Sequence, residues 1–273
     1  VDPTRKLIGV VELNRLLRSK RPMLISAIMD ENSRTIPVDL DQEEVARQFE
    51  RYNLMSAAIV DTDGRLVGVV TADDVVEVVN EEAEEDIYRL AGVGDETVSD
   101  TVVSTSRSRL PWLGVNLLTA MLASTVISFF GATIDQMVAL AVLMPICASM
   151  GGNAGTQTMT VAVRALATRD LSTVNAWRVI LRESLVGLIN GITFAVLIGL
   201  IAYLWFQSPG LGLVIASAMV INLLAAALAG ILIPITLDRF GADPAVASGV
   251  FVTMVTDVVG FMAFLGLATA WLV

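Results

Sequence analysis

The chain has 273 residues, of which 55% are hydrophobic, and its 28 acidic and 18 basic residues give a formal net charge of −10. This composition is too apolar for an ordinary soluble domain. The acidic balance argues against a nucleic-acid partner, which a basic surface would bind. Histidine is absent and Cys147 is the single cysteine, which excludes an internal disulfide and the usual zinc, haem and histidine acid–base chemistry. We therefore expect a membrane protein that is not an enzyme.

The charges divide the chain into two parts. Residues 1–109 hold 22 of the 28 acidic residues, and only six lie in 110–273. We predict a polar α/β region followed by a polytopic α-helical membrane domain. The chain begins with Val1 and opens inside what reads as a folded unit, without a signal peptide. We therefore expect it to be truncated at its N-terminus.

Residues 26–79 show the order strand, helix, strand, turn, strand, helix. Asp41 is placed to cap the first helix, expected at 42–52, and a turn at 61–64 joins two strand patterns. This order resembles a CBS (cystathionine-β-synthase-type) domain, a unit that works in pairs. Residues 1–25 match only the last strand and helix of a preceding copy, and we assign them as its remnant.

The end of the CBS region carries a candidate nucleotide site. Gly68, Thr71 and Asp74 follow the pattern Gly-x-x-Thr-x-x-Asp, which resembles the one with which some CBS pairs hold a nucleotide ribose. That resemblance implies that Thr71 and Asp74 bind a nucleotide such as ATP. The alternative is an ordinary strand-to-helix turn in which Thr71 caps the helix.

An acidic run follows. Residues 81–86 contain five carboxylates, within a predicted connecting helix and linker at 80–109. A solvated helix face is the ordinary interpretation of such a run. The alternative is a regulatory metal site, because crowded carboxylates repel one another until a hard cation that prefers oxygen ligands neutralises them.

Five stretches in the membrane domain, 110–273, are long enough to cross a bilayer. We expect spans at 112–130, 136–166, 184–206, 211–237 and 244–271. Arginines lie before the first span, between the second and third, and between the fourth and fifth, and the other two connections contain no Lys or Arg. The positive-inside rule therefore predicts a cytoplasmic soluble region and an external C-terminus in the cell (inner) membrane.

The second span contains the sequence Pro-Ile-Cys-Ala-Ser-Met-Gly-Gly-Asn-Ala-Gly-Thr-Gln-Thr at 145–158, inside a run without charge from 136 to 163. One proline and three glycines weaken a helix, and we expect the helix to be broken here. Freed backbone at membrane depth is tolerated only inside protein or beside a water-filled cavity. The sequence therefore predicts a pore lining, with a packing seam of small residues as the alternative.

Asp257 lies near the middle of the fifth span, where a carboxylate costs about 2.5–3.5 kcal/mol on insertion scales. We predict that it meets a cation in a watery passage. A bond to another helix or a protonated carboxyl is the alternative. Glu183 and Asp243 lie at the starts of the third and fifth spans, where roles in a pore compete with a local ion pair and a helix cap. Asn190 and Asn222 are expected to bond between helices.

The sequences Gly-Gly-Asn-Ala-Gly-Thr-Gln at 151–157 and Thr-Asp-Val-Val-Gly-Phe at 256–261 resemble the signature of the MgtE family of magnesium channels and transporters. The resemblance implies a homodimer whose second and fifth spans line the pore. Asp257 would bind hydrated Mg²⁺ there, and the other pore residues would be Gly151, Gly152, Asn153, Glu183 and Asp243. It also implies a plug helix that binds Mg²⁺ against the CBS region and shuts the pore. The regulatory shell would comprise Asp39, Asp41, Asp74, Glu81, Glu84 and Glu85.

The predicted function is Mg²⁺ uptake across the plasma membrane by a homodimer, gated by cytoplasmic Mg²⁺. The expected ligands are divalent cations, with ATP at the CBS region, in contact with membrane lipid and without nucleic acid. Three alternatives stay open. The first is a transporter of Mn²⁺ or Co²⁺, the second is a CBS-type nucleotide or metal sensor without flux, and the third is an intramembrane hydrolase whose two Asp257 carboxyls share a proton.

Overall fold

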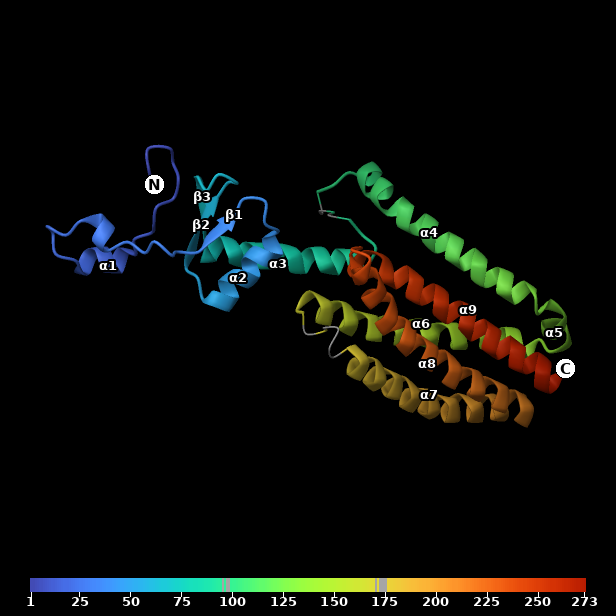
Figure 1. The fold of residues 1–273 in the computed structure, drawn as a ribbon. Helices are drawn as coiled ribbons and strands as arrows, with labels where there is room; N and C mark the ends of the chain where they lie inside the picture. The colour runs from blue at the N-terminus through green and yellow to red at the C-terminus, as the bar shows by residue number, and fades with distance from the viewer. Residues whose placement is uncertain (95, 97–98, 170, 172–175) are drawn as a thin grey trace. The chain divides into compact units, whose positions relative to one another are not determined.

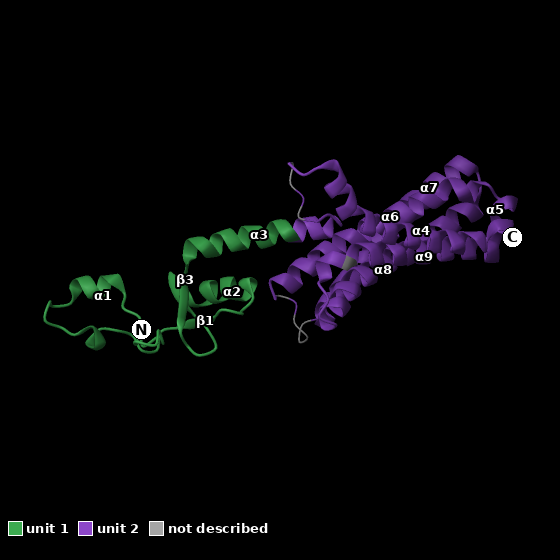
Figure 2. Ribbon diagram, turned by 90° about the horizontal axis from the view of Figure 1, so that it is seen from above, with its two compact units in different colours: residues 1–85 green, residues 86–273 purple. Residues whose placement is uncertain are grey.

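The structure, a computed structural model, describes all residues except 95, 97–98, 170 and 172–175. The chain forms two compact units, Val1–Glu85 and Asp86–Val273, which Figure 2 distinguishes by colour. The helix α3 (Ala72–Leu90) contains the boundary between them.

The first unit is built on a three-stranded sheet in the order β1-β2-β3. β1 (Thr35–Pro37) pairs in parallel with β2 (Ser56–Val60), and β2 pairs antiparallel with β3 (Leu66–Thr71). α2 (Gln42–Tyr52) makes the crossover between the two parallel strands. The strand and helix order predicted for 26–79 is therefore confirmed.

Local chemistry explains these elements. The Asp41 side chain accepts a hydrogen bond from the backbone N–H of Glu43 and so caps α2. Gly64 in the β2–β3 turn has a φ of +76°, which glycine adopts without steric cost. The sheet, α2 and α3 then bury a small core of Ile36, Phe49, Ala57 and Val75.

The first 25 residues contain little regular structure. α1 (Leu13–Arg18) is a six-residue helix with no buried residue, and the 3-10 turn η1 (Ile25–Ala27) follows. In the apolar run at 7–11, Val10 forms an isolated bridge with Asp30 and the Leu7 N–H donates to the Gly64 carbonyl, but the run forms no named strand. The assignment of 1–25 as a remnant domain stays a prediction.

In the second unit, the described residues form five long helices, each apolar enough to cross a membrane. They are α4 (Val102–Ser128), α6 (Ala139–Ala167), α7 (Ala176–Phe206), α8 (Pro209–Arg239) and α9 (Pro244–Leu272), with a short α5 (Gly131–Gln136) after α4. The five predicted spans are confirmed. α4 begins well before 112 because the Thr101 hydroxyl caps it, accepting from the N–H of Ser104.

α6 continues without interruption through Pro145 and the Gly151–Gly152 pair. The expectation of a broken helix is therefore wrong. Proline is tolerated in a membrane helix when neighbouring helices support it, and Gly151 and Gly155 are buried where such neighbours approach. These two glycines allow close packing of helices, which is the alternative predicted for this sequence.

α8 is the central helix of this unit and packs against α6, α7 and α9 (Figure 1). Small residues let these backbones approach closely. A Cβ atom built on Gly230 would lie 2.8 Å from the carbonyl oxygen of Gly155, and one on Gly187 would lie 2.6 Å from the Cβ of Ala227. The largest hydrophobic core among the described residues forms around α8.

Candidate functional site

α6 and α9 lie in contact and run in opposite directions. A Cβ atom built on Gly155 would lie 2.5 Å from Val252 Cγ1, and Cys147 Sγ lies 3.8 Å from the carbonyl oxygen of Gly260. Asp257 falls between these two points of α9. This arrangement places Asp257 at the depth of the Gly-Gly-Asn sequence on α6.

The Asp257 carboxylate is half-buried. Within the part of the chain that the structure describes, no side chain or backbone group is paired with it. The nearby hydroxyls bond within their own helix, Thr253 to the carbonyl of Gly249 and Thr256 to that of Thr253. A carboxylate held this way in a membrane helix is costly without a partner, and a cation would supply one.

Exposed polar side chains line one side of α6. Ser149, Asn153, Thr156 and Thr160 recur every three or four residues along α6, and all are exposed in the single chain. That spacing places them on one side of the helix. We use the name polar face for these four side chains of α6 together with the exposed Thr253 of α9. Hydrocarbon does not solvate such groups, so the polar face is suited to water or to another protein surface.

The two adjacent glycines of α6 have different surroundings. A Cβ atom on Gly151 would lie 2.3 Å from Asn222 Nδ2, whereas one on Gly152 would meet no atom within 4 Å. Gly151 is therefore a packing position against α8. Gly152 leaves open space on its side of α6.

Glu183 lies apart from this group. It is 7% exposed, on the face of α7 that also carries Gly187 and Gly191. Both glycines pack closely on α8, and Figure 1 shows α7 on the far side of α8 from α9. The structure therefore does not gather Glu183 with Asp257, and its role in a pore stays a prediction.

Asp243 makes two contacts at the start of α9. Its Oδ1 accepts from the backbone N–H of Ala245 at 2.8 Å, which caps the helix, and its Oδ2 pairs with the guanidinium of Arg89 in the last turn of α3. The cap is one of the two roles that the sequence predicts for Asp243, whereas the ion pair with Arg89 is not predicted. A lone cation in the last turn of an acidic helix, just before the membrane domain, was the available signal.

A cavity of about 510 Å³ adjoins this ion pair within the second unit. Its lining includes Arg89 and Arg109, together with Asn116, Thr156 and Thr253. Arg109 donates to the Glu96 carboxylate, which holds the pKa of Glu96 below its ordinary value. The cavity therefore joins two residues of the polar face to the end of α3.

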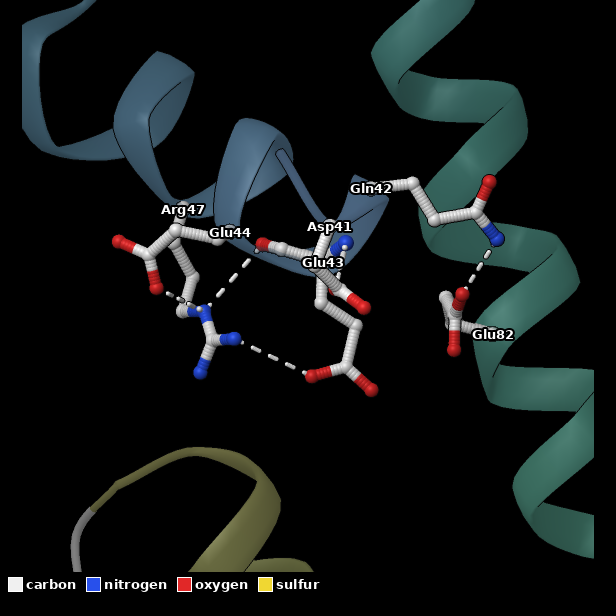
Figure 3. A network of polar contacts seen from close by, with 6 residues as sticks. All are labelled: Asp41, Gln42, Glu43, Glu44, Arg47 and Glu82. Atoms are coloured by element: carbon white, nitrogen blue, oxygen red, sulfur yellow. Dashed lines mark hydrogen bonds and ion pairs between the residues drawn. The ribbon is translucent and has the colours of Figure 1, made fainter. Parts of the chain in front are cut away.

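The predicted regulatory acids all lie in the first unit. Figure 3 shows the network around α2, where Arg47 pairs with Glu43 and Glu44 and where Gln42 donates to Glu82 of α3. Glu81, Glu84 and Asp39 are exposed. Among the residues described, no three carboxylate, cysteine or histidine side chains converge as metal ligands. The single chain therefore does not assemble the predicted shell.

The predicted nucleotide residues bond to each other. Asp74 Oδ2 accepts from the Thr71 hydroxyl at 2.6 Å and from the Thr71 backbone N–H at 2.8 Å. These bonds hold the pKa of Asp74 below its ordinary value of 3.8. The arrangement stabilises the turn from β3 into α3, and nucleotide binding stays a prediction.

An α/β domain followed by five long apolar helices, with a carboxylate and a polar face at membrane depth, defines a polytopic α-helical membrane protein. The MgtE model, described as a divalent cation transporter, matches residues 144–267, and the CBS domain model matches 25–81. The chain therefore resembles the MgtE family.

Curated relatives agree with this assignment. The magnesium transporters MgtE of Enterococcus faecalis and Bacillus subtilis are 36% and 34% identical to the chain over 272 and 275 residues, covering all of it. That of Thermus thermophilus is 37% identical over 274 residues and 98% of the chain. The chain spans 60% of the length of each of these relatives.

Two solved structures resemble part of the chain. The cytosolic domain of the Mg²⁺ channel MgtE in complex with ATP is 40% identical, with a TM-score of 0.28, over 29% of this chain and 32% of that one. The soluble part of a magnesium transporter is 35% identical, with a TM-score of 0.30, over 30% of this chain and 32% of that one.

Proposed function

We propose that two copies of the chain form a magnesium-selective channel in which Asp257 of each copy holds hydrated Mg²⁺ in a passage lined by α6 and α9. The observation that carries this proposal is the unpartnered Asp257 carboxylate beside a polar face that lipid does not solvate. The relatives named as magnesium transporters support the choice of ion.

The chemistry of Mg²⁺ suits this arrangement. The ion binds oxygen at about 2.0–2.1 Å, gives up water reluctantly and usually keeps several waters in protein sites. Two carboxylates that face each other across a symmetry axis would hold the hydrated ion through its waters. Such binding attracts a divalent ion and still releases it, which conduction requires.

The second copy would cover the polar face. Ser149, Asn153 and Thr156 are exposed in one chain. In a symmetric pair, these side chains of both copies would line a water-filled passage between them. Closed twofold dimers are the commonest symmetric assemblies. Light scattering in detergent should give the mass of two copies, and a mass of one copy would contradict the dimer.

We place the soluble unit in the cytoplasm and the C-terminus outside the cell membrane. Arginines lie at the start of α4, the end of α6, the start of α7 and the end of α8, whereas the connections after α4 and after α7 contain no Lys or Arg. Because consecutive spans alternate in direction, the arginine-bearing ends all lie on one side of the membrane, the side from which α4 begins. The positive-inside rule makes that side cytoplasmic. Mg²⁺ would then flow inward down its electrochemical gradient. Protease added outside sealed cells should remove a C-terminal tag, and protection of that tag would contradict this orientation.

Gating would depend on the acidic residues of the first unit. Glu81 and Glu84 are exposed residues of α3. The last turn of the same helix contains Arg89, which forms the ion pair with Asp243. Mg²⁺ bound among these acids and Asp39, Asp41, Asp74 and Glu85 would reduce their repulsion and stabilise α3. High cytoplasmic Mg²⁺ would thereby keep the channel closed.

The direct test is Mg²⁺ uptake by liposomes that contain the purified protein. Wild type should take up Mg²⁺, and Asp257→Ala should fall to the level of empty liposomes because the ion loses its binding charge. Asp238→Ala is the matched control, since Asp238 is an exposed carboxylate at the end of α8. Equal uptake by wild type and Asp257→Ala would contradict the proposal.

The same assay separates the alternatives. Uptake of Mn²⁺ or Co²⁺ without Mg²⁺ would indicate another divalent transporter. The absence of all ion uptake would favour a CBS-type sensor. ATP binding at Thr71 and Asp74 is a separate proposal, which calorimetry with wild type and Thr71→Val would test.

A further inference from the structure

Asn222 of α8 is a fully buried polar side chain at the place where α8 meets both α6 and α9. It is 0% exposed, and its Nδ2 donates to the carbonyl oxygen of Cys147 on α6 at 2.8 Å. A Cβ atom on Gly151 of α6 would lie 2.3 Å from this nitrogen, and one on Gly260 of α9 would lie 2.7 Å from it. The amide therefore occupies a slot that two glycines on two helices leave open.

This slot joins the three helices at the depth of the candidate ion site. Cys147 Sγ lies 3.8 Å from the Gly260 carbonyl oxygen and 3.7 Å from Asn222 Nδ2. On α9, Asp257 precedes Gly260 by one helical turn. On α6, Asn153 follows Gly151 by two residues. A shift of Asn222 would therefore move both helices beside the candidate ion site, α6 with Asn153 and α9 with Asp257.

The bonding of Asn222 is incomplete. In the described part of the chain, its Oδ1 is the one buried side-chain nitrogen or oxygen atom without a hydrogen-bond partner. A buried polar atom without a partner destabilises the fold, and leucine of similar size would avoid that cost. An asparagine with one specific donor bond instead selects one register between helices, which is the best-attested use of buried polar groups.

We propose that Asn222 is a positioning residue that sets the separation and register of α6 and α9, and through them the geometry of the ion site at Asp257. This inference rests on the proposed function, because it assigns the register a consequence for Mg²⁺ binding. Asn222 itself need not touch the ion.

The test compares Asn222→Leu with wild type in the liposome assay, at several Mg²⁺ concentrations. Residues that orient metal-binding groups typically change metal affinity by about 10–100-fold when replaced. We therefore expect the half-saturating Mg²⁺ concentration to rise at least about tenfold. The matched control is Asn190→Leu, since Asn190 is an exposed asparagine of α7. Its half-saturating concentration should equal that of wild type.

A purely structural role predicts a different result. It would lower the thermal stability or the yield of folded protein without changing the half-saturating concentration of the molecules that fold. If wild type takes up Mg²⁺ and folded Asn222→Leu has the same half-saturating concentration as wild type, this inference is overturned and the proposed function stands. No uptake by wild type would overturn the proposed function and this inference together.

A second variant covers the case in which Asn222→Leu does not fold. Gly260→Ala alone should be destabilised, because its Cβ would meet the amide of Asn222. Asn222→Ala combined with Gly260→Ala moves volume from α8 to α9 and should recover folding. That paired variant should still show the raised half-saturating concentration, because the bond to Cys147 is lost. A wild-type value would overturn the inference.

Discussion

Glu183 and Asp257 are two acidic residues of membrane helices with different surroundings. Glu183 is 7% exposed on the α7 face that packs on α8, whereas Asp257 is half-buried beside the polar face. The two residues therefore predict different consequences of replacement.

Replacing Glu183 with glutamine should stabilise the membrane unit or leave it unchanged, and should preserve Mg²⁺ uptake. The substitution removes the charge from a residue that is 7% exposed, which lowers the cost of removing that side chain from water on folding. Thermal unfolding in detergent and the liposome assay measure the two effects. Loss of uptake with intact folding would instead place Glu183 on the ion pathway.

Reasoning from single residues identified Asp257 because a charge in an apolar span is visible in the sequence. The sequence also predicts a helix cap as one of two roles for Asp243 and a bond between helices for Asn222, and the structure contains both contacts. The pairing of Arg89 with Asp243 could not be inferred, since 154 positions separate them in the chain. Contacts of that range depend on how the helices pack.

At the scale of elements, close packing around α8 depends on its glycines. Gly230→Ala should destabilise the membrane unit by about 1–3 kcal/mol, because its Cβ would meet the backbone carbonyl of Gly155 at 2.8 Å. Gly114→Ala is the control, since a Cβ there meets nothing within 4 Å. Thermal unfolding of both variants provides the measurement, and equal stability would contradict the packing described.

The five long helices were predictable because hydrophobic length is a strong signal. Their ends were less predictable, as the early start of α4 at Val102 shows. The continuity of α6 was missed because helix propensity penalises Pro145 and the glycines. Tertiary packing outweighs that penalty here, and it acts between residues that are distant in the chain.

At the scale of the whole molecule, Mg²⁺ should protect α3 from trypsin. Cleavage after Arg89 requires local opening of the helix, and Mg²⁺ bound by the acidic residues would oppose it. Raising Mg²⁺ on the side of the soluble unit should slow this cleavage in wild type. The double variant Glu81→Gln/Glu84→Gln should lose the protection, and equal protection in both proteins would contradict the gating proposal.

We propose that the polar face beside Asp257 borders water at membrane depth. The most direct test of this proposal is the reaction of Thr253→Cys, in a Cys147→Ala background, with a charged, membrane-impermeant thiol reagent. Thr253 is exposed one turn before Asp257, and Ile189→Cys on the exposed surface of α7 is the control. We predict that Cys at 253 reacts and that Mg²⁺ slows the reaction, while Cys at 189 stays unmodified. Equal resistance of both positions with Mg²⁺ absent would contradict the account.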